Sequence, residues 1–133
     1  MNSFVPGLEK TEMGSIQIAP EVVAIIAGMA TMEIDGVYGM SGSGISELLG
    51  RKNLTKGVNV EVGEKQTAVD VSVIIEYGQS IPELSRKIQT NVKQAIESMT
   101  GLEVVEVNVH INDVHFHDLE RQDEETGFIK LRK

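Results

Sequence analysis

The clearest structural signal in the chain is residues 80–101, SIPELSRKIQTNVKQAIESMTG. Ser80 followed three residues later by Glu83 has the pattern of a capping box, and Pro82 is tolerated in the first turn of a helix. Gly101 supplies the left-handed residue with which helices commonly end. The stretch therefore predicts one long α-helix.

One face of this helix is apolar, because large apolar residues recur at helical spacing opposite charged and amide side chains. Each such side chain contributes at most about 1.5–3 kcal/mol when fully buried, before entropy is subtracted. We expect the helix to anchor the core. The apolar face comprises Ile81, Leu84, Ile88, Val92, Ala95, Ile96 and Met99, and the opposite face Arg86, Lys87, Gln89, Lys93 and Glu97.

Alternating apolar and polar residues predict a hairpin before the helix and a strand after it. The hairpin joins residues 58–62 to residues 69–76 through a turn at 63–66. In the last strand the apolar parity changes at Val114, which predicts a bulge near Asn112 and Asp113. Its apolar face comprises Val105, Val107, Val109 and Ile111, and its polar face Glu106, Asn108 and His110.

A second helix is predicted from Pro20 to Ile34, after a short strand at residues 15–18. Pro20 and the acidic Glu21 suit a first helical turn, and Asp35-Gly36 ends the pattern. Its apolar residues recur at helical spacing, so we expect them to form a packed face. They are Val22, Ile25, Ile26, Met29 and Met32, with the small residues Gly28 and Ala30 allowing close approach.

Residues 36–57 are glycine-rich and predict a long loop, with one helical turn at 46–49. The element order is short strand, helix, strand, strand, helix, strand. That order predicts an α+β fold with one mixed sheet and two helices packed on one face. We expect residues 1–13 to be a flexible N-terminal tail, 14–117 a single α+β domain and 118–133 a charged C-terminal tail.

Composition narrows the class of protein. Asp and Glu number 20 against 12 Lys and Arg, so the net charge of -8 disfavours nucleic acid as a partner. The absence of cysteine suits a reducing cytosol, and the N-terminus lacks the features of a signal peptide. The longest apolar stretch, residues 22–32, is far shorter than the ~20 residues of a membrane span. We therefore expect a cytoplasmic protein with no direct membrane span.

Motifs for catalysis are weak throughout. The loop at 36–44 lacks the Lys-Ser or Lys-Thr pair of a phosphate-binding loop, and Ser41 lacks the closing glycine of a nucleophile elbow. Three histidines, His110, His115 and His117, lie near Asp113 and Asp118 but read more simply as surface residues than as metal ligands. We expect no enzyme, with no catalytic, cofactor-binding or metal residues and no cofactor.

The second sheet face is expected to be polar and acidic, without the aromatic and basic residues of an RNA-binding sheet. An open face of this kind, together with the glycine-rich loop, is a candidate surface for protein partners. The candidate interaction residues are Gly39, Met40, Ser41, Gly42, Glu61, Asp70, Ile74, Glu76, Glu106 and His110.

Several separated segments resemble the bacterial alkaline shock (envelope stress response) protein family. The resemblance begins with GSIQIAPEVV at residues 14–23 and EIDGV at 33–37. It continues with EYGQSIP at 76–82, IQTNV at 88–92 and MTGLEVVEVNVHI at 99–111. Residues 48–58 look most like the branch found beside acetyl-CoA carboxylase genes.

This resemblance implies a cytoplasmic, non-enzymatic protein of Gram-positive bacteria that self-associates and supports cell-envelope homeostasis. It also implies a protein partner, such as a membrane-anchored partner of the family that recruits the chain to the membrane. Two alternatives stay open: regulation of acetyl-CoA carboxylase and fatty-acid synthesis, and binding of a small molecule or nucleotide through the glycine-rich loop.

Overall fold

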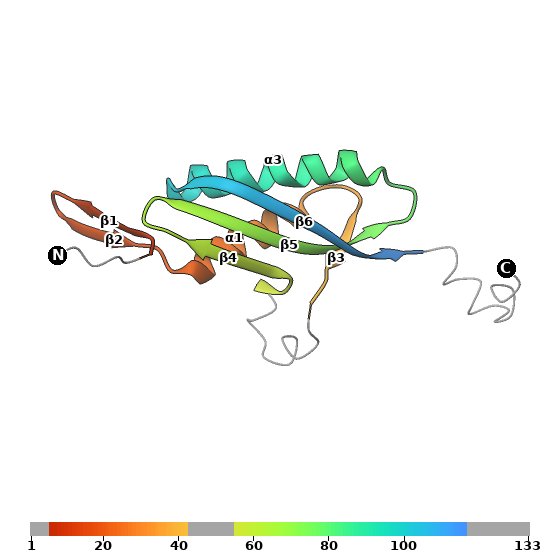
Figure 1. The fold of residues 1–133 in the computed structure, drawn as a ribbon, viewed down its shortest axis with the longest axis horizontal. Coiled ribbons are helices and arrows are strands. Elements are labelled where there is room, and N and C mark those ends of the chain that lie inside the picture. The colour runs from red at the N-terminus through yellow and green to blue at the C-terminus, as the bar shows by residue number, and fades with distance from the viewer. Residues whose placement is uncertain (1–5, 43–54, 117–133) are drawn as a thin grey trace, which may run out of the picture.

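The computed structural model describes residues 6–42 and 55–116. β5 (Gln66–Glu76) is the central strand of a four-stranded sheet (Figure 1). β4 (Val58–Val62) pairs antiparallel with its first part and β3 (Val37–Met40) with its last part. β6 (Glu103–His115) pairs parallel with β5 over its whole length, on the other side of that strand. The sheet is therefore mixed, as predicted.

Two helices cover one face of this sheet. α1 (Pro20–Met32) packs on β3, β4 and β5, whereas α3 (Ile81–Thr100) packs on β6 and against α1. Strand β5 alternates, so every second side chain is buried under the helices. The α+β class and the placement of both helices on one face are confirmed. The buried side chains of β5 are Thr67, Val69, Val71, Val73 and Ile75.

α3 begins and ends where the sequence predicts. Ser80 is the N-cap residue, and Gly101 ends the helix in the left-handed region with φ of 77°. The capping box is wrong, however, because the Ser80 side chain makes no capping hydrogen bond. Four residues in the middle of the predicted apolar face are buried: Leu84, Ile88, Val92 and Ile96. Ile81 and Met99, which lie in the first and last turns, are 44% and 70% exposed.

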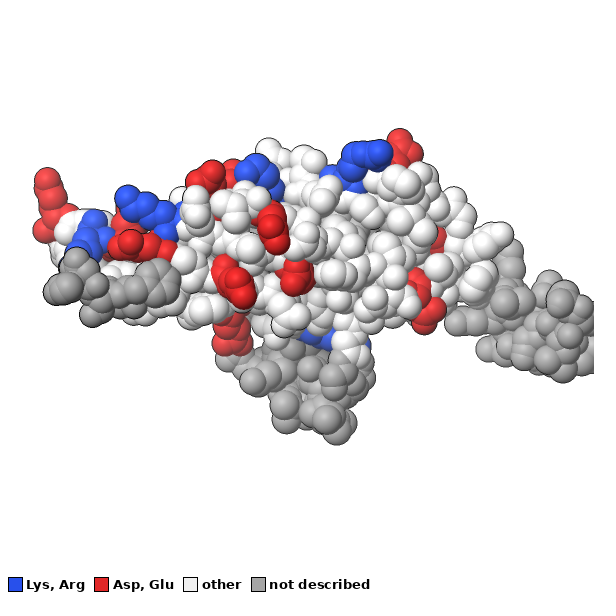
Figure 2. Space-filling model, in the orientation of Figure 1, with Lys and Arg blue, Asp and Glu red and all other residues white. Residues whose placement is uncertain are grey.

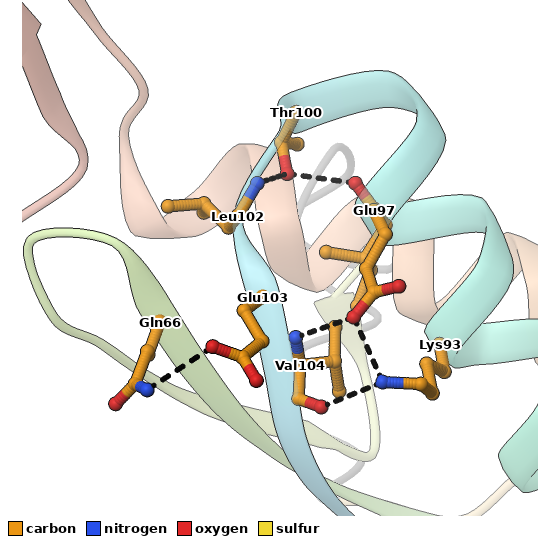
Figure 3. A network of polar contacts seen from close by, with 8 residues as sticks. Gln66, Lys93, Glu97, Thr100, Leu102, Glu103 and Val104 are labelled. Atoms are coloured by element: carbon orange, nitrogen blue, oxygen red, sulfur yellow. Dashed lines mark hydrogen bonds and ion pairs between the residues drawn. The ribbon is translucent and has the colours of Figure 1, made fainter.

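A polar network joins the end of α3 to the start of β6 (Figure 3). Lys93 Nζ donates to Glu97 Oε2 at 2.8 Å and to the carbonyl of Val104 at 3.1 Å. The same carboxylate oxygen accepts the backbone N–H of Val104 at 2.9 Å. Further along, Gln89 donates to the carbonyl of Val107 at 3.0 Å. Among the strands described, β6 pairs with β5 alone, so side chains of α3 satisfy backbone groups along its free edge.

The N-terminal part differs from the prediction. β2 (Gly14–Gln17) does not join the main sheet; it pairs with β1 (Leu8–Thr11) in a separate two-stranded sheet. Residues 8–11, which we expected in a tail, thus form a strand. A backbone bond from the N–H of Gly7 to Gly63 O, at 3.0 Å, links this hairpin to the main domain, and a bond from the N–H of Ile18 to Gly7 O, also at 3.0 Å, closes its base.

The glycine-rich segment also differs, because residues 37–40 form β3 rather than a loop. A register shift at Tyr38 and the glycine at position 39 hide the alternation that would have revealed this strand. The rest of the predicted loop, including the helical turn at 46–49, lies mostly outside the described residues. The predicted tail at 118–133 lies outside them as well.

β6 contains two irregularities. The register with β5 shifts between Ile111 and Asp113, which confirms the bulge predicted near Asn112. A second shift, between Val104 and Glu106, was not predicted. It places Val105 outside the regular pairing and leaves it 51% exposed, so its assignment to the buried face is wrong.

Candidate interaction surfaces

The sheet face away from the helices, here called the outer sheet face, is lined by the remaining side chains of β5. These side chains are half-buried, and they are Ala68, Asp70, Ser72, Ile74 and Glu76. Their partners on the neighbouring strands have the same orientation, since paired residues share a face. The partners are Asn59, Glu61 and Gly39 on one side, and Glu106, Asn108, His110, Asp113 and His115 on the other.

Seven of the ten predicted surface residues, Gly39 among them, therefore lie on one face. Glu61 and Glu106 flank Ala68 from opposite sides, and Asp70 lies between Asn59 and Asn108. The amide of Asn108 holds two carboxylates in place, donating to Asp70 Oδ1 at 2.8 Å and to Glu106 Oε2 at 2.9 Å. Further along β5, His110 lies opposite Ser72, and Ile74 and Glu76 occupy the next two positions on this face.

The outer sheet face is acidic. Its strand positions given above include carboxylates but no Lys or Arg. Figure 2 shows red side chains over the sheet, with blue ones toward the N-terminal hairpin, along α3 and at the border of the undescribed segment. A patch of one sign attracts partners of the opposite sign and discriminates against like-charged ones.

An aromatic pair closes one end of the outer sheet face. The rings of Tyr38 and His115 stack with centroids 3.7 Å apart and an interplanar angle of 11°. His115 Nδ1 lies 3.5 Å from Glu76 Oε1. The sequence analysis identified Glu76 but missed Tyr38, because the bulge that aims its ring across β5 is not visible in the pattern.

The described part of the glycine-rich segment borders this face. The Ser41 N–H donates to Ser72 O at 2.9 Å, and Asn112 Nδ2 donates to Ser41 Oγ at 3.2 Å. A Cβ at Gly42 would lie 2.8 Å from Lys56 Cγ, so the two ends of the undescribed segment lie close together. Met40 is different, since its side chain packs against the core.

A second surface was missed by the sequence analysis. Val22, Ile25, Met29 and Met32 line the side of α1 away from the sheet, and we call these four residues the α1 stripe. Val22 is 43%, Met29 59% and Met32 45% exposed, while Ile25 is half-buried. The apolar periodicity predicts these four side chains and Ile26 on the packed face of α1, which is wrong for four of them, since only Ile26 is buried.

The packed face of α1 is made mainly of small residues instead. Val23, Ala24, Ala27, Gly28, Ala30 and Thr31 are buried together with Ile26. Small side chains let α1 approach α3 and the sheet closely, which leaves the longer methionines outside. Apolar residues surround α1, so periodicity alone could not identify the buried side. The lack of a polar face on α1 was the feature of the sequence that could have indicated a second apolar surface.

Histidines and carboxylates do not converge into a metal site in the part of the chain described. Within residues 6–42 and 55–116, no group of three or more such side chains is arranged to hold an ion. His110 and Asp113 lie on the outer sheet face, His115 stacks on Tyr38, and His117 lies outside the described residues. No helix in these same ranges has both the length and the apolarity of a membrane span.

Comparison with known proteins places this geometry in a family. The pattern of the ASP23 family, described by a cell envelope-related function, matches residues 8–116. The chain belongs to the ASP23 family. The match begins at β1 and ends one residue after β6, so it includes the N-terminal hairpin as well as the main domain.

Similarity to individual proteins is consistent with the family match. YqhY of Bacillus subtilis (strain 168) is 39% identical over 111 residues, covering 81% of this chain and 82% of that protein. YloU of the same organism is 34% identical over 110 residues, covering 79% and 92%. The stress response regulator gls24 homolog of Streptococcus pyogenes serotype M1 is 34% identical over 105 residues, covering 76% of this chain and 59% of that protein. The family description and the name of the streptococcal relative together support an envelope- and stress-related family role.

Among solved structures, chains titled MamM CTD align with a TM-score of 0.45 and 12% identity. One such alignment covers 70% of this chain and 93% of that chain. Similarity at this level carries no argument about function.

Proposed function

We propose that this ASP23-family chain is a non-catalytic adaptor in the envelope stress response and acts through protein–protein contacts. The observation that carries the proposal is the exposed apolar surface of α1, on the opposite side of the molecule from an uncovered acidic sheet face. Exposed apolar patches on folded proteins are commonly sites of contact with other macromolecules. In this proposal the chain resides in the cytoplasm, self-associates, and reaches the membrane through an anchored partner.

Site-specific crosslinking in the native host tests this function. A photoreactive residue would replace His110 on the outer sheet face, Met29 on the α1 stripe, or Glu64 in the β4–β5 turn as a control position. We expect defined crosslinks to a protein or to a second copy from His110 or Met29, and none from Glu64. Free, uncrosslinked chain at both test positions under stress and at rest would contradict the proposal.

The carboxylase alternative rests on residues 48–58, most of which lie outside the described residues. Deleting the gene separates it from the adaptor function, because a carboxylase regulator predicts a direct change in acetyl-CoA carboxylase activity. The ligand-binding alternative predicts that a nucleotide raises the melting temperature, by an amount that grows with the logarithm of its concentration relative to Kd. We expect neither effect.

A further inference from the structure

We propose that the α1 stripe docks an amphipathic α-helix of a partner protein whose apolar seam is flanked by Lys or Arg. This inference rests on the proposed function and names the chemistry of the partner. It begins with the composition of α1. In Pro20–Met32 the only charged residue is Glu21, and the hydroxyl of Thr31 is buried and donates to Ala27 O at 2.8 Å.

The contrast with α3 shows why the composition matters. α3 presents charged and amide side chains such as Arg86, Lys87 and Gln94 to solvent, as a surface helix does. A helix that is apolar all round is normally covered on every side. Within the described residues, α3 and the sheet cover only one side of α1, and three members of the α1 stripe are 43–59% exposed.

The spacing of the α1 stripe favours another helix as its occupant. Positions 22, 25, 29 and 32 follow one another at intervals of three, four and three residues, which is the a and d pattern of a helix–helix seam. Two of the four are methionines, whose flexible side chains adapt to a partner surface. A seam of this kind accepts the a and d residues of a second helix.

The charge beside the α1 stripe favours a basic partner over a second copy of α1. Glu21 and Glu33 are exposed on opposite sides of the stripe, at the g and e positions that select the partner in paired helices. Asn91 holds Glu33 in place, since its Nδ2 donates to Glu33 Oε1 at 2.9 Å. Another α1 carries no Lys or Arg to pair with these carboxylates, whereas a helix with basic flanks does.

Synthetic helices test the inference on the full chain. The first probe has Leu at a and d and Lys at e and g over about three heptads. The second has Glu at e and g, and the third has the composition of the first in scrambled order. Fluorescence anisotropy measures each Kd. We expect the Lys probe to bind at least about tenfold more tightly than either of the others, a difference typical of one well-placed contact.

Matched variants locate the binding. Met29→Gln is expected to weaken binding of the Lys probe at least about tenfold, the scale of a central interface residue. Met99→Gln, at the single methionine of α3, which is 70% exposed, is expected to leave it unchanged. Both substitutions replace an exposed side chain with a neutral one, and equal melting temperatures confirm that both variants fold. The double variant Glu21→Lys with Glu33→Lys is expected to prefer the Glu probe.

Three results would overturn the inference: equal binding of the scrambled Lys probe, equal loss in the two methionine variants, or crosslinking of position 29 only to the same copy of the chain. The last would mean that another part of the chain covers the stripe. The proposed function fails separately. If position 29 or position 110 crosslinks to a protein in the native host but the Lys probe does not bind, the proposed adaptor function is supported and the inference of a basic partner helix is rejected.

Discussion

At the scale of single residues, the most informative side chain is Glu97. Hydrogen bonds from the Lys93 ammonium and from the backbone N–H of Val104 stabilise its ionised form and lower its pKa below the ordinary range for glutamate. Because this carboxylate connects α3 to the first residues of β6, its protonation is coupled to the joint between a helix and a strand.

The lowered pKa of Glu97 predicts how stability depends on pH. A carboxyl group whose pKa is lower in the folded state stabilises the fold fully above its unfolded pKa of about 4.3, and this contribution disappears as pH falls through the folded pKa. Glu97→Gln should therefore lower the free energy of unfolding by a constant amount above about pH 5, with the difference from wild type shrinking below about pH 4. Urea denaturation across this range measures it.

Glu64→Gln is the control for that series, because Glu64 is an exposed residue of the β4–β5 turn. It makes none of the contacts drawn for the network around Glu97, so it controls for the loss of one surface carboxylate. A wild-type-like pH profile for Glu97→Gln would contradict the role assigned to the network.

A second prediction concerns Gly57, at the start of β4. Its φ of +76° lies in the left-handed region, and a Cβ there would lie 2.5 Å from Ser41 O. Gly57→Ala should cost about 1–3 kcal/mol, because it adds both backbone strain and a clash. Gly39→Ala is the matched control, since φ is not positive there and nothing lies within 4 Å of the added carbon. Equal unfolding midpoints in urea for the two variants would argue against this backbone geometry.

At the scale of elements, α3 and α1 use apolar residues in opposite ways. α3 is amphipathic and buries one row of Leu, Ile and Val against the sheet and α1. α1 buries small residues on one side and leaves the α1 stripe on the other. α3 therefore anchors the core, and α1 connects the core to a surface suited for partners.

Substitutions along α3 test this division. Ile88 is fully buried, so Ile88→Asp should unfold the domain by burying an unpaired charge. Ile88→Val should cost only about 0.5–1.5 kcal/mol. Met99→Asp places the same charge at a 70% exposed position of the same helix and should keep the fold. Circular dichroism and the elution volume of each variant give the readout; a folded, soluble Ile88→Asp would show that α3 is packed differently.

Elements differ in how clearly their sequence pattern indicates which side chains are buried. Strongly periodic elements, α3 and the β4–β5 hairpin, could be predicted, as could the bulge at Asn112 where the apolar parity changes. The second bulge, at Val105, could not, because valine fits either parity. Strand β1 has a single apolar residue, Leu8, and in β3 the register shift at Tyr38 interrupts the alternation, so neither strand could be predicted.

The same reason explains which residues of the candidate surfaces could be predicted from the sequence. The orientation of Glu61, Asp70 and Glu106 could be predicted, because strand parity fixes which face each side chain occupies. The position of Tyr38 could not, since it depends on a local register shift. The α1 stripe could not be predicted, because apolar residues lie all round this helix and their spacing does not show which side is buried.

At the scale of the whole molecule, the fold places the hydrophobic core apart from the two surfaces that we propose for partner contacts. The core lies between the helices and one side of the sheet, while the outer sheet face and the α1 stripe lie on opposite sides of it. One is acidic and the other apolar, so they suit different partners. A chain with two such surfaces is able to join two proteins, as an adaptor must.

Quantitative co-purification from the native host tests this account most directly. The full chain would carry a small affinity tag and be isolated under gentle conditions with and without envelope stress, and the mass of the intact complexes would be determined. We predict a defined protein partner or a homo-oligomer in stoichiometric amounts. Recovery of a bare monomer under every condition would contradict the account.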